Sequence, residues 1–241
     1  MLGFVIIDVD TNQDHQLLQD IAEAATLWAD ATRLGRPSPY GWDATAFVRA
    51  GLNVKDVMPG EIPVLLVSHM TVADALGFHQ KDASGKPSAV IYPALLDDVA
   101  SQLAGVITHE IGEALIDPEC ARLALGNDGR LRALEISDAV ETQNVPIKIA
   151  SGKTILCSAY CTPAWFSAPA QLTGVSVAVG DGTDGMRPGE ILPGGYMSYF
   201  DGVEWTQEQV GQKSRYRDQL ATVGGVSRHE RRVTLARLSR P

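Results

Sequence analysis

The most constraining feature of the chain is a long apolar segment that carries three ionisable side chains close together. Residues 97–116 read DDVASQLAGVITHEIGEALI, with apolar residues at helical spacing. Two aspartates at the start are typical of a helix N-terminus, and Asp117-Pro118 ends the helix because the residue before a proline disfavours helical backbone. The pattern predicts a helix over about residues 97–116 that packs against a core while bearing one histidine and two glutamates.

These three residues have the spacing of a metal site. His109 and Glu113 lie one turn apart, so an imidazole and a carboxylate can hold one cation from the same side. Glu110 lies about 100° around the helix, beside such a cation instead of on it. This spacing is that of the HExxH zinc motif, with glutamate in place of the second histidine. In that motif the intervening glutamate takes a proton from the activated water and passes it to a leaving amine.

A charged helix with an ordinary surface histidine is the alternative interpretation of this segment. Five His and 11 Glu in 241 residues give about 0.01 such matches by chance. Ionisable side chains in an otherwise apolar helix also indicate a partner or a bound metal, because burying unpaired charge is costly. We therefore expect Zn²⁺ at His109 and Glu113, with Glu110 as the catalytic base.

A catalytic zinc usually has three protein ligands and one open position, so a further ligand must come from elsewhere. The segment 133–141 offers Glu135 and Asp138, which share a face if it is helical. Asp117 and Glu141 are other nearby carboxylates, and a solvated acidic stretch is the alternative for each of them. We favour Glu135 or Asp138, because a second segment can complete a tetrahedron that one straight helix cannot.

The other histidines and the cysteines carry weaker patterns. His79 either lines the cleft on an adjacent strand or makes a structural hydrogen bond, whereas His69 and His229 lack ligand spacing. An odd number of cysteines cannot all pair within the chain, and their spacing does not form a zinc ribbon. We expect reduced thiols at Cys120, Cys157 and Cys161.

The remaining pattern predicts an α+β protein in which helices cover one face of a mixed sheet. The expected elements before residue 97 are a strand over 3–9, a helix over 14–34, a strand over 62–67, and strands over 76–79 and 88–92 joined by a turn at 82–87. Beyond residue 143 glycine and proline become frequent. We expect a C-terminal half of short strands and loops over residues 144–205.

Charge divides the chain into two parts. The net charge of −9 combines −15 over residues 1–211 with +6 over residues 212–241. We expect a body over residues 1–206 and a basic C-terminal helix or arm over 207–241. An acidic body argues against general nucleic-acid binding, which needs a broad cationic face. The arm could dock on an acidic partner or on a sister subunit.

Membrane insertion and secretion are not expected. No apolar run approaches the 18 or more residues that indicate a transmembrane helix. The opening MLGFVIIDVD lacks a basic region and is typical of a folded strand instead of a signal peptide.

The chain resembles a family of proteins from tailed phages and bacterial genomes. The shared pattern is [S/T]HE-hydrophobic-x-E-x-hydrophobic-x-DP, then E-x-x-D-x-V-E, TPAWF and PGGY, in the same order. The matching stretches are GFHQKDASGKPSAVIY (77–92), THEIGEALIDPE (108–119), LEISDAVE (134–141), CTPAWF (161–166) and LPGGY (192–196). The resemblance covers roughly residues 15–200 and implies a zincin-like domain, the fold of metallopeptidases, with its active-site helix at about 97–116.

Two functions follow as expectations. The first is a zinc-dependent, peptidase-like protein of phage or prophage origin that acts on a peptide or protein substrate. In it, zinc binds His109, Glu113 and an acidic residue from 135–138. The alternative is a non-enzymatic virion or assembly protein that keeps the fold and binds a sister subunit or virion partner through its basic arm. Either protein would be found in the virion or the host cytoplasm.

Overall fold

The computed structural model describes residues 1–31, 41–69, 76–81, 85–126, 128–166, 175–200 and 203–211. Five N-terminal strands form one sheet: β1 (Leu2–Asp8), β2 (Ala46–Gly51), β3 (Glu61–Leu66), β4 (Gly77–Lys81) and β5 (Pro87–Ile91). Their order in the sheet is β2-β1-β3-β5-β4, and only the edge strand β4 runs antiparallel to its neighbour. The expected mixed sheet is therefore confirmed.

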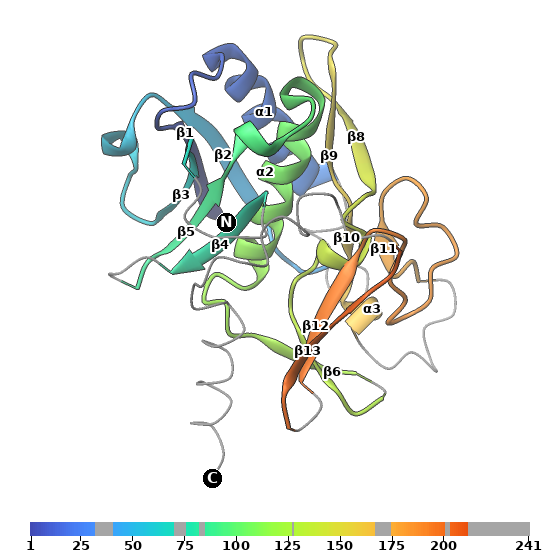
Figure 1. The fold of residues 1–241 in the computed structure, drawn as a ribbon. Helices are drawn as coiled ribbons and strands as arrows, with labels where there is room; N and C mark the ends of the chain where they lie inside the picture. Colours follow the sequence, from blue (N-terminus) through green and yellow to red (C-terminus); the bar gives the residue numbers. More distant parts are fainter. Residues whose placement is uncertain are drawn as a thin grey trace.

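Two long helices, α1 (His15–Ala31) and α2 (Val99–Ile116), pack on one side of this sheet (Figure 1). The side of these helices that faces away from the sheet is covered by a hairpin of β8 (Asn144–Lys148) and β9 (Thr154–Ser158). Trp28 of α1 is fully buried and donates from Nε1 to the carbonyl of Ser158 at 3.0 Å. In the described part of the chain, no helix is long and apolar enough to cross a membrane.

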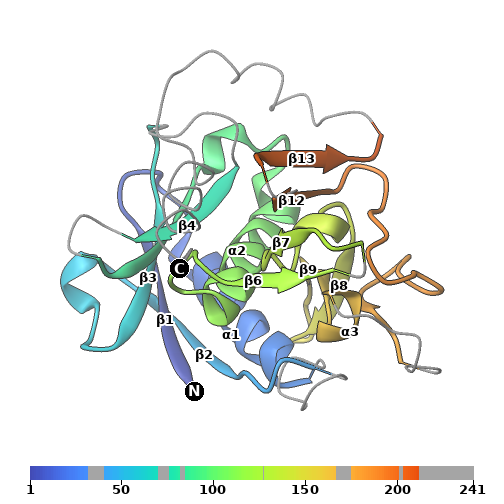
Figure 2. The same cartoon turned by 90° about the horizontal axis from the view of Figure 1, so that it is seen from below.

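The C-terminal half consists of short elements, as expected. A second sheet has the order β13-β12-β7-β6, and Figure 2 shows α2 between this sheet and the first one. Its strands are β6 (Leu123–Leu125), β7 (Leu131–Ala133), β12 (Tyr196–Phe200) and β13 (Trp205–Gln209). The remaining elements are β10 (Tyr160–Cys161), β11 (Ala178–Val179), the short helix α3 (Pro163–Phe166), and the 3-10 turns Val54–Asp56, Pro93–Leu95 and Asp138–Val140. The molecule is thus α+β.

Helix α2 lies within the predicted range, and its ends and rotation have identifiable causes. Asp98 caps its start by accepting a hydrogen bond from the Ala100 amide at 3.1 Å. Along its buried side, the hydroxyl of Thr108 accepts from the Ser158 amide and donates to the Ala104 carbonyl, both at 2.7 Å. These bonds fix which face of α2 meets β9 and hence where the next residue, His109, lies.

Several expected bounds differ from the structure. Segment 133–141 is not a helix, because β7 ends at Ala133 and only Asp138–Val140 make a 3-10 turn. The expected boundary at residue 206 falls inside β13, which pairs with β12, so Gln207–Gln209 belong to the body. Residues 32–34 of the first helix, residues 82–84 of the turn, and residues 212–241 of the arm lie outside the described residues.

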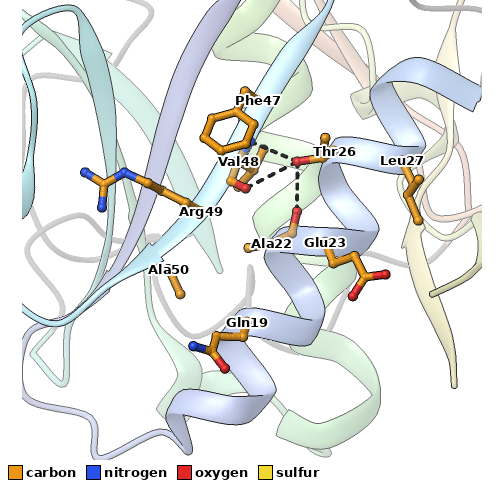
Figure 3. A pocket seen from close by; sticks show the side chains of 9 residues that line it. All are labelled: Gln19, Ala22, Glu23, Thr26, Leu27, Phe47, Val48, Arg49 and Ala50. Atoms are coloured by element: carbon orange, nitrogen blue, oxygen red, sulfur yellow. Dashed lines mark hydrogen bonds between the residues drawn. The ribbon is translucent and has the colours of Figure 1, made fainter. Parts of the chain in front are cut away.

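An open groove lies between α1 and the edge strand β2 (Figure 3). Thr26 links the two elements, since its hydroxyl accepts from the Val48 amide at 2.9 Å and donates to the Val48 carbonyl at 3.2 Å. The lining residues are Gln19, Ala22, Glu23, Thr26, Leu27, Phe47, Val48, Arg49 and Ala50. None of them belongs to the ionisable cluster around α2.

Candidate metal centre

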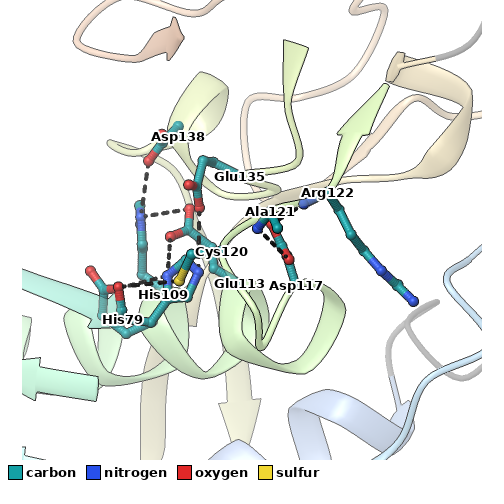
Figure 4. Close-up of polar contacts among 10 residues, drawn as sticks. His79, His109, Glu113, Asp117, Cys120, Ala121, Arg122, Glu135 and Asp138 are labelled. Carbon is teal, nitrogen blue, oxygen red and sulfur yellow. Dashed lines mark hydrogen bonds and ion pairs between the residues drawn. The ribbon is translucent and has the colours of Figure 1, made fainter. Parts of the chain in front are cut away.

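Six ionisable side chains from three segments meet at the C-terminal half of α2 (Figure 4). One comes from strand β4, three from α2, and two from the loop that follows β7. They are His79, His109, Glu110, Glu113, Glu135 and Asp138. All are buried except His109, whose side chain is 12% exposed. We call these six residues the α2 cluster.

The first half of the cluster surrounds His109. Its Nε2 lies 3.1 Å from Oε1 of Glu113 and 3.2 Å from Oδ1 of Asp138. One ligand atom from each of these three residues lies within 4.8 Å of the others. A single cation can therefore reach all three, and two of them are the residues one helical turn apart in the HEIGE sequence.

The second half surrounds His79 and uses the other oxygen of Glu113. Nδ1 of His79 lies 3.3 Å from Oε2 of Glu113 and 3.6 Å from Oε2 of Glu110. On the opposite side of the ring, Nε2 lies 3.8 Å from Oε2 of Glu135. His79, Glu110 and Glu113 form a second set of ligand atoms within 4.8 Å of one another.

A glycine lets β4 approach α2 closely enough to bring His79 into the cluster. A Cβ at Gly77 would lie 2.7 Å from Cδ1 of Ile91 and 3.1 Å from Cγ of Glu110. A larger residue at position 77 would push the strand away from the helix. Gly77 therefore sets the distance between the two elements that supply His79 and Glu110.

A second glycine supports the turn that carries Asp138. A Cβ at Gly195 would lie 2.5 Å from the carbonyl oxygen of Ala139, so only glycine allows this approach. The Leu192 amide donates to the same carbonyl at 3.0 Å, and the Cys161 amide donates to the Ile136 carbonyl at 2.6 Å. The distant LPGGY stretch thus holds the Asp138 turn in place.

Burial and mutual repulsion shift the protonation of the cluster. Desolvation raises the pKa of Glu113 to about 7, and the charges of Asp138 and Glu135 act in the same direction. Burial lowers the pKa of His109, but the charge of Glu113 and the contact with Asp138 outweigh it and raise that pKa well above its usual value. Both shifts describe a site that attracts positive charge.

The chemistry of the cluster fits a divalent cation. Imidazole nitrogens and carboxylate oxygens are the donors that Zn²⁺ takes besides thiolate. Four carboxylates in a buried site repel one another, and burial of ionised groups is costly unless they are paired or bind a metal. The C-terminal half of a helix also favours positive charge. His109, Glu113 and Asp138 would supply three protein ligands, the number typical of a catalytic zinc.

The predicted site residues lie together in the structure, but the two candidate third ligands lie beside different histidines. Asp138 lies beside His109, whereas Glu135 lies beside His79. Asp117 points elsewhere and accepts from the amides of Ala121 and Arg122, at 3.0 and 2.9 Å, which shapes the turn after α2. The sequence left the role of His79 undecided, and the signal that could have identified it is the nearby Gly77.

The cysteines stand apart from the ligand sets. No disulfide joins the three of them, all of which lie in the described residues, in agreement with the expectation of thiols. Burial raises the pKa of the Cys157 thiol to about 12, so it stays protonated. The Cys120 thiol lies 3.7 Å from the His79 carbonyl oxygen and belongs to neither set.

Comparison of the chain with protein-family models, with curated proteins and with solved structures found no match. The zincin-like fold, the phage family and the peptidase activity therefore stay predictions from the sequence. The site itself is defined by the positions of its side chains.

Proposed function

We propose that the protein is a metal-dependent hydrolase whose cation, expected to be zinc, binds His109, Glu113 and Asp138. The observation that supports this proposal most is the placement of two carboxylate oxygens at 3.1 and 3.2 Å from one imidazole nitrogen. Two of the three ligands come from a helix and the third from a separate turn, so the set surrounds one point instead of lying along a line.

The neighbouring Glu110 would act as the general base. A bound divalent cation lowers the pKa of a coordinated water toward neutrality. Glu110 is buried on the adjacent face of α2, where its carboxylate can accept a proton and donate it to a leaving group. Two carboxylate ligands leave the cation less positive than two histidines would, so we expect slow or specialised hydrolysis.

The substrate class is proposed from the motif. The order of His109, Glu110 and Glu113 is similar to that of zinc peptidases, so the proposed substrate is a peptide or protein. The non-enzymatic assembly role depends on the basic arm expected over residues 207–241. It stays a prediction because residues 212–241 of that arm lie outside the described residues.

The metal content of the purified full-length protein tests the proposal. After dialysis against zinc without chelator, the wild type and the control His69→Ala should retain stoichiometric zinc, because His69 is exposed and belongs to neither ligand set. His109→Ala should lose the cation bound at this position. Absence of zinc from the wild type, or equal zinc in both variants, would contradict the proposal.

A further inference from the structure

We propose that the α2 cluster binds two divalent cations bridged by Glu113, one at His109 and Asp138 and the other at His79 and Glu110. The inference rests on the proposed function for the first cation and adds a second binding position. Its starting point is the carboxylate of Glu113, which presents Oε1 to His109 and Oε2 to His79.

The two histidines belong to separate ligand sets. His109 groups with Glu113 and Asp138, whereas His79 groups with Glu110 and Glu113, and only Glu113 is common to both sets. Each set contains one imidazole and two carboxylates. A carboxylate that uses one oxygen for each cation is a bridge, and hydrolases with two bridged metals hold them about 3.5–4 Å apart.

The surroundings of His79 are those of a metal ligand. Its side chain is only 2% exposed, and its Nδ1 faces two carboxylates at 3.3 and 3.6 Å. Its Nε2 faces Glu135. A histidine that binds a metal through one ring nitrogen commonly has a carboxylate beside the other nitrogen, which fixes the orientation of the ring. Glu135 would therefore orient His79 instead of binding the first cation.

The charge of the cluster also favours two cations. The four carboxylates are those of Glu110, Glu113, Glu135 and Asp138. If all are ionised and both histidines are neutral, one divalent cation balances half of the negative charge and two balance it completely. Charge that is both buried and unbalanced is costly, so the second cation stabilises the assembled site.

Glu110 can act both as a ligand of the second cation and as the general base, because a carboxylate has two oxygens. Oε2 is the atom that faces His79 and would bind the second cation. Oε1 would then accept the proton during hydrolysis. A cation on Oε2 would hold the Glu110 side chain in one orientation and so position the base.

The number of cations bound per chain tests this inference. Full-length protein is saturated with Mn²⁺ or Zn²⁺, freed of excess by gel filtration, and its metal content is measured. We expect two cations in the wild type and in Gln80→Ala, a control on the same strand. We expect one in His79→Ala and one in His109→Ala, with each variant checked for cooperative unfolding. His79→Gln replaces His79→Ala if the latter does not fold.

The outcomes separate the two proposals. One cation in the wild type that His79→Ala keeps would overturn the second position and leave the proposed function intact. Loss of all metal in both histidine variants would mean that a single cation uses both rings, which also overturns the inference. No metal in the wild type would remove both proposals. As a second measurement, Mn²⁺-loaded wild type should give the electron paramagnetic resonance spectrum of coupled ions, and a spectrum of isolated ions would contradict it.

Discussion

Glu113 has a histidine on each side: its Oε1 lies 3.1 Å from Nε2 of His109, and its Oε2 lies 3.3 Å from Nδ1 of His79. One of these histidines is a neighbour along the helix, and the other comes from a strand 34 positions earlier in the sequence. A fully buried carboxylate between two imidazoles holds the centre of the site, so changes around it give specific expectations.

Asp138→Asn should weaken cation binding at His109 by at least about 100-fold, because it removes a charged ligand and even an outer partner typically costs 10- to 100-fold. Asp117→Asn is the control, since Asp117 accepts two backbone hydrogen bonds after α2 and lies outside both ligand sets. It should cost about 1 kcal/mol of stability and leave affinity unchanged. Competition titration with a metal indicator measures both affinities, and equal losses would contradict the assignment.

Glu110→Gln should keep the cation at His109 but lower any hydrolysis by roughly 10²- to 10⁴-fold, because the amide cannot accept the proton. The substitution preserves the shape of the buried side chain. Metal content and peptide hydrolysis are measured on the same preparation. Loss of the His109-bound cation would show that the roles of Glu110 and Glu113 are wrongly divided.

Gly112→Ala should destabilise the fold by about 1–3 kcal/mol. The new Cβ would lie 2.9 Å from Cη2 of Trp28, which is fully buried and hydrogen bonded to Ser158. Gly105→Ala in the same helix meets only ordinary contact, 3.5 Å from Oδ1 of Asn144. It should therefore stabilise the protein by up to about 1 kcal/mol through helix propensity. Urea unfolding compares the two, and a stabilised Gly112→Ala would show that α1 and α2 pack less closely.

The metal-free protein should lose stability as the pH rises from 6 to 8. Glu113 has a folded pKa of about 7, above its ordinary value of 4.5, so its contribution is present below pH 4.5 and is lost as the pH passes 7. The raised pKa of His109 acts in the same direction. Glu113 alone gives roughly 1–2 kcal/mol over this interval.

Thermal unfolding with a chelator at pH 6 and pH 8 measures this effect, with Glu113→Gln as the variant that lacks the titrating carboxylate. A cation requires Glu113 to be ionised, so added zinc should raise the melting temperature more at pH 8 than at pH 6. A metal-free wild type that becomes more stable toward pH 8, relative to Glu113→Gln, would contradict the pKa shift.

The parts of the site that could be predicted from sequence are those fixed by local geometry. Helical spacing alone places His109 and Glu113 on one face, and the aspartates at each end mark where α2 begins and ends. The choice between Glu135 and Asp138 could not be made, because it depends on a 3-10 turn held by contacts with the remote Gly195. The turn predicted over residues 82–87 implies the pairing of β4 with β5. The close approach of β4 to α2, which brings His79 into the cluster, is a tertiary contact that Gly77 permits but does not by itself predict.

Anomalous diffraction at the zinc absorption edge, from crystals of the full-length protein grown with zinc, tests the metal centre most directly. We expect a peak about 2.0–2.2 Å from Nε2 of His109 and from the nearest oxygens of Glu113 and Asp138. If a second cation binds as proposed, a second peak should lie beside Nδ1 of His79, on the other side of Glu113. Zinc-saturated crystals with no anomalous peak at the α2 cluster would contradict the central claim.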